Sequence, residues 1–184
     1  MVVTAIQDSD NVLPITIEAY HLLYERGLIP EKAELIEGVI FSKMPKNPIH
    51  SEILRKLNLF LYKNLSEKYI ISSENPITIE DSESEPDIAI LPEGNYSKEH
   101  PKFAILIIEI ANTSLSFDRK KAYIYDKGNI PEYLIFNLND LKIEAYKNPR
   151  DGIYTEIKIL SKDELFLSTN LAGLQFSFET FCKE

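Results

Sequence analysis

The sequence lacks several features that would place it directly in a functional class. Its 184 residues contain one cysteine, Cys182, so no internal disulfide can form, and a reducing cytoplasmic location is expected. No apolar run approaches the ~18 residues that a transmembrane helix needs, and no glycine-rich loop of the phosphate-cradling type is present. These absences exclude a disulfide-stapled domain, a chain with a membrane-spanning helix and a P-loop nucleotide hydrolase.

Positive charge is also scarce, because 20 Lys and Arg face 29 Asp and Glu, and the formal net charge is −9. A protein that coats nucleic acid needs an excess of Lys and Arg to contact phosphates, so this class is disfavoured. An enzyme that holds nucleic acid briefly through metal ions stays compatible with the charge, since bound cations offset a clustered acidic site.

The length suits one domain with one core. We expect residues 1–13 to form a loosely held leader, because they lack the basic and apolar segments of a secretion signal. Residues 14–184 are then expected to form a single domain, since no repeat or low-complexity linker divides them.

Apolar periodicity and capping residues predict three helices, at 15–27, 47–68 and 116–128. Thr16 and Asn47 are candidate N-caps of the first two, and either Ser116 or Asp118 could cap the third. In the second helix one apolar stripe is expected, made of Ile49, Ile53, Leu57, Phe60, Leu61 and Leu65.

Strand signals alternate with these helices, and they indicate an α/β (α+β) fold with a mixed sheet flanked by helices. Residues 104–111, "AILIIEIA", are apolar on both faces, which is typical of a central strand covered on both sides. The C-terminal tail from 167 is expected to add a strand and a short helix. The predicted strands are a pair around Gly38 within 33–44, then 69–73, 76–80, 86–91, 103–111, 132–137, 142–147 and 154–160.

Two carboxylates interrupt these apolar strands. Glu109 should share a strand face with Ile105 and Ile107, where a bare carboxylate would be costly without a cation or strong donors. Asp87 opens the preceding strand directly after Pro86. If the two strands are neighbours, with axes ~4.8 Å apart, both carboxylates can address one hard divalent cation such as Mg²⁺ or Mn²⁺.

Each acid alone has a simpler explanation. A single Glu in an apolar strand is often a salt-bridged residue, and a single Asp after proline is often a turn residue. The two acids together, followed at once by a basic helix, favour a functional site.

The ordered set of these residues resembles the PD-(D/E)XK nuclease superfamily, and within it the Uma-two-type putative restriction endonuclease family. Pro86-Asp87 and Glu109 match the superfamily core. The family pattern recurs from about residue 14 to 160, and the resemblance implies a restriction-endonuclease-like mixed central sheet flanked by helices. Its matching pieces are "ELIEG" (34–38), "NPIH" (47–50), "SEPDIAIL" (84–91), "IIEIANTSLSFDRKK" (107–121) and "YDKGNIPEYLIF" (125–136).

The resemblance implies that Asp87 and Glu109 hold the metal. Glu34 resembles the family's upstream acid and could complete the metal shell through water, although a surface glutamate beside a turn is an equal alternative. The superfamily has a lysine two positions after the second acid, where this chain has Ala111. In the family the basic group comes from the next helix, and the matching residue is Lys121, which would orient water or stabilise phosphate.

The helical motif is shortened here to "DRKK", residues 118–121. Lys120 and Lys121 differ by about 100° around a helix, so one of them faces the site, and we favour Lys121. Lys120 and Arg119 remain candidates for substrate contacts.

The histidines are weaker candidates. His50 matches a family position at the edge of the site, where it could contact substrate phosphate or shuttle a proton, although an exposed first-turn histidine is an equal alternative. His21 and His100 have no evident partners in the sequence. No zinc site is expected from their spacing with one cysteine available.

These observations predict a metal-dependent endonuclease that acts on nucleic acid, with DNA as the expected substrate and Mg²⁺ or Mn²⁺ as cofactor. A homodimer is expected by analogy with nucleases of this fold. Two alternatives stay open. Ala111, the shortened "DRKK" and the acidic balance would suit a non-catalytic binding or assembly module, and the same carboxylates would serve a phosphoesterase of small substrates.

Overall fold

A six-stranded mixed sheet forms the centre of the molecule. The computed structural model describes residues 13–43 and 45–182, so all but the last residue of the expected leader lies outside the described residues. The strand order is β10-β9-β8-β7-β6-β3, in which β7 and β8 are parallel and all other pairs are antiparallel. The strands are β3 (Tyr69–Ser73), β6 (Ile88–Pro92), β7 (Leu106–Ala111), β8 (Glu132–Asn137), β9 (Lys142–Arg150) and β10 (Ile153–Leu160).

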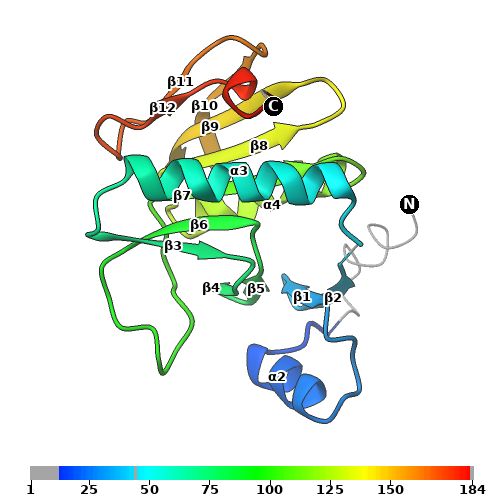
Figure 1. Ribbon diagram of the computed structural model, residues 1–184. Coiled ribbons are helices and arrows are strands. Elements are labelled where there is room, and N and C mark those ends of the chain that lie inside the picture. Colours follow the sequence, from blue (N-terminus) through cyan, green and yellow to red (C-terminus); the bar gives the residue numbers. More distant parts are fainter. Residues whose placement is uncertain (1–12, 44, 183–184) are drawn as a thin grey trace.

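A helix covers each face of this sheet. Helix α3 (Pro48–Asn64) lies across one face, and α4 (Leu115–Lys127), which connects the parallel strands β7 and β8, lies on the other (Figure 1). Leu57 of α3 packs in one core cluster with Ile108, whereas Tyr125 of α4 packs in a second cluster with Ile107. Strand β7 is therefore buried on both sides, which confirms the expectation of a mixed sheet flanked by helices.

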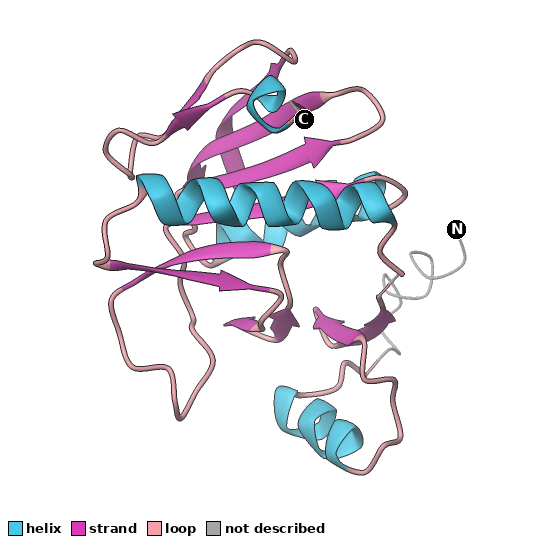
Figure 2. Ribbon diagram, in the orientation of Figure 1, coloured by secondary structure: helices cyan, strands magenta, loops and turns pink. Residues whose placement is uncertain are grey.

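A smaller antiparallel sheet, with the order β2-β1-β5-β4, adjoins the central one (Figure 2). The predicted strand pair around Gly38 is confirmed, because Glu37 and Gly38 make the turn with positive φ of 48° and 73°. Strand β5 was not predicted, since its sequence "SES" has no apolar residue. The strands of this sheet are β1 (Ala33–Ile36), β2 (Val39–Ser42), β4 (Ile77–Ile79) and β5 (Ser82–Ser84).

Two of the three predicted helix caps are confirmed. The Thr16 side chain accepts from the Ala19 amide at the start of α2 (Ile17–Glu25), and the Asn47 side chain accepts from the His50 amide at the start of α3. The prediction for α4 was wrong, because the helix begins one turn earlier than Asp118. Ser114 is its N-cap, and the Ser114 carbonyl accepts from the Asp118 amide at 2.9 Å.

The buried stripe of α3 also differs from the prediction at its first position. Ile49 is exposed, whereas His50 is buried at the N-terminal end of the row that continues through Ile53, Leu57 and Leu61. A helix repeats every 3.6 residues, so positions 50, 53, 57 and 61 share one face. The histidine is thus turned toward the sheet rather than toward solvent.

The C-terminal segment packs over the α3 side of the sheet. It contains the two-stranded pair β11 (Phe166–Leu167) and β12 (Gln175–Phe176), followed by a 3₁₀ turn at Phe178–Phe181. The expected strand and short helix of the tail are therefore present. No helix in the described part of the chain is long and apolar enough to cross a membrane.

Candidate active site

The pairing of β6 with β7 brings the two strand carboxylates together. Ile88 lies opposite Ile108 in this antiparallel pair, so one position further along the same register Asp87 lies opposite Glu109. The Asp87 amide donates to Glu109 Oε2 at 3.2 Å, and the Ile110 amide donates to Asp87 Oδ2 at 2.8 Å. Each carboxylate is thus held by the backbone of the other strand, and both are nearly inaccessible to solvent.

A cavity of about 290 Å³ opens over these two carboxylates. Its lining contains five carboxylates and three lysines, which leaves an excess of two negative charges when all of them are ionised and His50 is neutral. The carboxylates are Glu34, Glu85, Asp87, Glu109 and Asp118, and the lysines are Lys43, Lys46 and Lys121.

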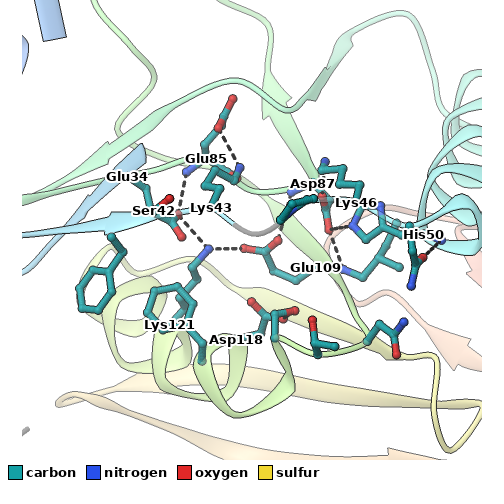
Figure 3. Close-up of a pocket in the computed structure, with 18 residues that line it drawn as sticks. Glu34, Ser42, Lys43, Lys46, His50, Glu85, Asp87, Glu109, Asp118 and Lys121 are labelled. Carbon is teal, nitrogen blue, oxygen red and sulfur yellow. Dashed lines mark hydrogen bonds and ion pairs between the residues drawn. The ribbon is translucent and has the colours of Figure 1, made fainter. Parts of the chain in front are cut away.

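Lys121 is the buried cation of the cavity. Figure 3 shows its side chain reaching from α4 to a position between Glu34 and Glu109. Its Nζ lies 2.9 Å from Glu34 Oε2 and 3.0 Å from Glu109 Oε1, and only 4% of the side chain is exposed. Burial opposes the charged form of this amine, but the surrounding acids Glu109 and Glu34 raise the pKa of Lys121 well above its ordinary value.

Asp87 has two cationic or polar partners of its own. His50 Nε2 lies 3.0 Å from Asp87 Oδ2, and Lys46 Nζ lies 2.8 Å from Asp87 Oδ1 and also contacts Glu74. Burial raises the pKa of the Asp87 carboxyl, but the hydrogen bonds and charges of His50 and Lys46 outweigh burial and hold that pKa below its usual range. The Asp87 carboxyl is therefore ionised at neutral pH.

Glu109 is in a less favourable environment than Asp87. Burial raises the pKa of Glu109 to about 8, against the opposing effect of the Lys121 ammonium. Tyr125 also donates its hydroxyl to Glu109 Oε1 at 3.1 Å, and this hydroxyl lies 3.0 Å from Ser84 Oγ. An additional cation near Glu109 would favour its ionised form.

Asp118 lies one helical turn before Lys121 and borders the same cavity. The Ser114 hydroxyl donates to its carboxylate at 2.6 Å. Burial raises the pKa of the Asp118 carboxyl, with Lys121 acting in the opposite direction. Asp118 thus adds to the acidic surface around Lys121.

The residues fit a hard divalent cation. Asp87 and Glu109 offer carboxylate oxygens on the same side of the sheet, which is the ligand type that Mg²⁺ and Mn²⁺ prefer. With all of the lining carboxyls and lysines ionised, the excess of two negative charges matches the charge of such an ion, which would itself favour the ionised form of Glu109. His50 adds a polar atom, because its Nδ1 is buried without a hydrogen-bond partner among the described residues.

The structure does not bring all of the predicted site residues together. Lys121 and not Lys120 enters the cavity, and Lys120 is exposed on the helix surface. The Arg119 guanidinium binds Glu144 of β9 through two hydrogen bonds, of 2.8 Å and 2.6 Å, and lies outside the cavity lining. The 100° steps around α4 turn these three consecutive residues to different surroundings. Glu34 lies at the site, but its contact is with Lys121.

Asp118, Tyr125 and Lys46 contribute to the site but were not predicted from the sequence as site residues. The clearest available signal was the spacing of Asp118, Lys121 and Tyr125, which are three and four residues apart and so share one face of α4. Lys46 had no such signal, because its contact with Asp87 spans 41 positions and depends on the tertiary fold.

Comparisons with known proteins identify the fold and the family of the chain. The crystal structure of a putative nuclease belonging to DUF820 from Anabaena variabilis superposes with a TM-score of 0.73 at 19% identity, and the match covers 91% of this chain and 97% of that one. At this identity the likeness shows the fold. No curated protein matches the chain. The model of the Uma2 family, described as putative restriction endonuclease, matches residues 17–179, and the chain belongs to this family.

Proposed function

We propose that the protein is a divalent-metal-dependent endonuclease that hydrolyses phosphodiester bonds of nucleic acid, with DNA as the expected substrate. The observation that carries the proposal is the pair Asp87 and Glu109, which lie opposite each other on adjacent strands and below a cavity that Lys121 also enters. The Uma2 family match and the nuclease-like fold support the same reaction class.

Asp87 and Glu109 would hold Mg²⁺ or Mn²⁺. When bound, such an ion would polarise the phosphoryl group of the substrate and lower the pKa of a water molecule. In the overall reaction the oxygen of a water molecule bonds to phosphorus, the bond from phosphorus to the leaving oxygen breaks, and the leaving oxygen gains a proton. The charge that develops on the phosphoryl oxygens must be balanced by cationic groups fixed in advance.

Lys121 is the fixed cation of the chain itself. Its ammonium would orient the attacking water or neutralise the developing charge, because a lysine is a compact donor with three protons to share. Glu34 is a positioning residue in this scheme, since it contacts the Lys121 Nζ at 2.9 Å and keeps the amine charged. This role differs from the water-mediated metal contact expected from the sequence.

His50 and Lys46 contact Asp87 from the side that faces away from Lys121 (Figure 3). His50 keeps one ring nitrogen on the Asp87 carboxylate, and its other nitrogen, the unpartnered Nδ1, can accept or donate a proton. Lys46 is one-quarter exposed and can exchange its contact with Asp87 for a substrate phosphate. Both residues would thus act in substrate binding.

The test is a cleavage assay on plasmid DNA, single-stranded DNA and RNA with Mg²⁺ or Mn²⁺. We expect Asp87→Asn and Glu109→Gln to lose at least ~100-fold in rate, the cost of losing electrostatic stabilisation of a transition state. Lys120→Ala is the matched control on α4 and should cleave like the wild type. Intact substrates in every condition, or unchanged cleavage by Asp87→Asn, would reject the proposal.

A non-catalytic module that retains the fold is the second candidate. The specific observation in its favour is that Asp87 already pairs with Lys46 at 2.8 Å and Glu109 with Lys121 at 3.0 Å, so each of these two acids has a cationic partner within the chain. Calorimetric titration of Mn²⁺ separates the two candidates. A stoichiometric site that Glu109→Gln abolishes supports the nuclease, and a folded protein that binds no Mn²⁺ supports the module.

We also propose a homodimer, by analogy with nucleases of this fold. Light scattering should give twice the 21.2 kDa mass of the chain. A monomer mass at working concentration would refute this part of the proposal.

A further inference from the structure

A second polar cluster lies on the other side of β5 from the cavity. Successive residues of a strand point to opposite faces, and Ser84 contacts Glu34 at the cavity while Glu83 contacts His21 of α2. His100, from the loop between β6 and β7, completes the cluster. One ligand atom from each of His21, Glu83 and His100 lies within 4.8 Å of the other two, and no other trio of His, Cys, Asp and Glu in the described residues comes so close.

The carboxylate of this cluster is fixed in place. Glu83 is only 5% exposed, and its oxygens lie 2.8 Å and 3.0 Å from His21 Nε2. The Thr78 hydroxyl also donates to Glu83 Oε2 at 3.1 Å. Because two groups orient it, this carboxylate is held in one direction before any ligand binds.

The loop that carries His100 is anchored to β4, the strand that carries Thr78. The Thr78 amide donates to the Pro101 carbonyl at 2.9 Å, directly after His100 in the chain. A residue before proline is restricted to extended conformations, so the backbone of His100 has little freedom. Thr78 therefore positions two of the three residues, Glu83 through its side chain and His100 through its backbone.

The ligand types select a class of metal. Two imidazoles and one carboxylate are the protein ligands of a well-known class of zinc sites, and imidazole suits Zn²⁺, Cu²⁺, Fe²⁺ and Ni²⁺ better than Mg²⁺. This chemistry differs from the all-carboxylate pair of the cavity, Asp87 and Glu109. The two clusters should therefore prefer different ions.

The geometry is close to what such an ion requires. Two ligand atoms of a tetrahedral zinc ion are about 3.3 Å apart, given bonds of ~2.0–2.1 Å. His21 Nε2 and Glu83 Oε1 lie 2.8 Å apart, so these two atoms would have to move only slightly away from each other. His100 has to move inward, and its exposed side chain can do so by rotation. Its ring already meets the His21 ring edge-on, with centroids 6.4 Å apart.

Solvent reaches the cluster from two sides. Two hollows meet at it, and His21, Glu83 and His100 border both. The other charged groups of these hollows include Glu74, Glu85, Glu18 and Glu80, with Lys98 and Lys102 on one side. A cation therefore has an access route through mainly acidic surroundings, and space remains for water as a further ligand.

We propose that His21, Glu83 and His100 form a transition-metal site, with Zn²⁺ as the ion that fits its ligands. Three protein ligands leave one tetrahedral position for water or another small ligand. The ion would join α2 and the loop between β6 and β7 to the small sheet. No sequence pattern indicated this site, because its proposed ligands are 62 and 17 positions apart.

Imidazole NMR tests the proposal, since the chain has three histidines. Zn²⁺ is titrated into metal-free protein in the presence of millimolar Mg²⁺, and the ring signals are assigned by their loss in His21→Ala, His50→Ala and His100→Ala. We expect the His21 and His100 rings to shift and to saturate at one equivalent, while His50 keeps its signal. Glu83→Gln should weaken zinc binding at least tenfold.

Two control variants accompany the titration. Glu80→Gln alters an exposed carboxylate nearby, and Cys182→Ser removes the exposed thiol, and both should bind zinc like the wild type. Shifts confined to His50, or wild-type zinc affinity in a folded His100→Ala protein, would overturn the proposal. The readout does not use cleavage, so the result is independent of the proposed nuclease reaction.

Discussion

The two clusters on either side of β5 balance a buried carboxylate in different ways. At the cavity, Glu34 and Glu109 share the ammonium of Lys121, whose side chain is 4% exposed. On the other side, Glu83 is equally buried, but its partner His21 is 44% exposed and carries a charge only when protonated. One cluster contains a buried lysine, whereas the other contains an imidazole, a group that can bind a metal ion through its ring nitrogen.

The two partners of the buried carboxylates therefore differ in how easily they can move away: Lys121 is buried, whereas His21 is partly exposed. If a buried lysine between two carboxylates is removed, both carboxylates stay buried without a positive charge beside them. Such a lysine therefore stabilises the folded state as well as the site. An exposed imidazole can turn toward an ion at little cost in stability. The comparison predicts a graded set of effects, from large ones at the cavity to small ones at the histidine cluster.

The largest effect is expected for Lys121→Ala. Removal of the ammonium leaves Glu34 and Glu109 buried without their shared cation, and breaking such a pair costs about 3–5 kcal/mol. Urea unfolding followed by circular dichroism measures the loss. The neighbouring variant Lys120→Ala, at an exposed position, should stay within ~0.5 kcal/mol of the wild type. Equal stabilities of the two variants would contradict the structural role of Lys121.

Tyr125→Phe should have a smaller effect at the same cavity. The lost hydroxyl donates to Glu109 Oε1 and also contacts Ser84. Glu109 Oε1 keeps its contact with Lys121, so the expected cost is that of one hydrogen bond to a charged group, about 1.5–3 kcal/mol. The same unfolding experiment measures it. Tyr62→Phe is the matched control, because Tyr62 is 67% exposed on α3. A loss as large in the control would mean that the hydrogen bond is not the cause.

Thr78→Val should act on the histidine cluster alone. The substitution removes the hydroxyl that orients Glu83, and loss of a group that orients a metal ligand weakens affinity by about tenfold or more. Calorimetric titration with Zn²⁺ measures the change. Thr155→Val, on β10, removes a hydroxyl that contacts Asn148 and should leave zinc affinity unchanged. Unchanged affinity in Thr78→Val would show that Glu83 is oriented by other contacts.

The smallest effect is expected for His100→Ala in metal-free protein, within ~0.5 kcal/mol of the wild type, because the side chain is exposed. With Zn²⁺ at 100 times its Kd, only the wild type should gain stability, by about 2.7 kcal/mol. Thermal unfolding with and without Zn²⁺ checks both statements. Equal gains in the two proteins would place the zinc elsewhere.

The sequence predicted those parts of the fold that depend on local patterns. The three helices, the strand pair around Gly38 and the doubly buried strand β7 all follow from apolar periodicity and turn residues. Asp87 and Glu109 were singled out because each acid adjoins or interrupts an apolar run, and the structure meets the condition that their strands are neighbours. The short strand β5 was missed, since pairing with β1 and β4 and not its own composition makes it a strand.

Contacts between distant segments set the limit of prediction at the site. Glu34 was expected near the metal, but its partner Lys121 arrives from a helix 87 positions later. Arg119 was expected at the substrate, but Glu144 of β9 binds it on another side of α4. The His21–Glu83 contact likewise needs the small sheet to be assembled before it exists.

The register of β6 against β7 also determines when the site can appear during folding. Asp87 and Glu109 face each other in one alignment only, and a slip of one residue would send one of the two side chains to the opposite face of the sheet. Helices form from local contacts, whereas this pairing joins segments that are 22 positions apart in the chain. In a refolding experiment the helical signal should therefore return before the capacity to bind Mn²⁺. Mn²⁺ binding at the proposed site would therefore report correct alignment of β6 with β7, which a spectroscopic measure of helix content does not report.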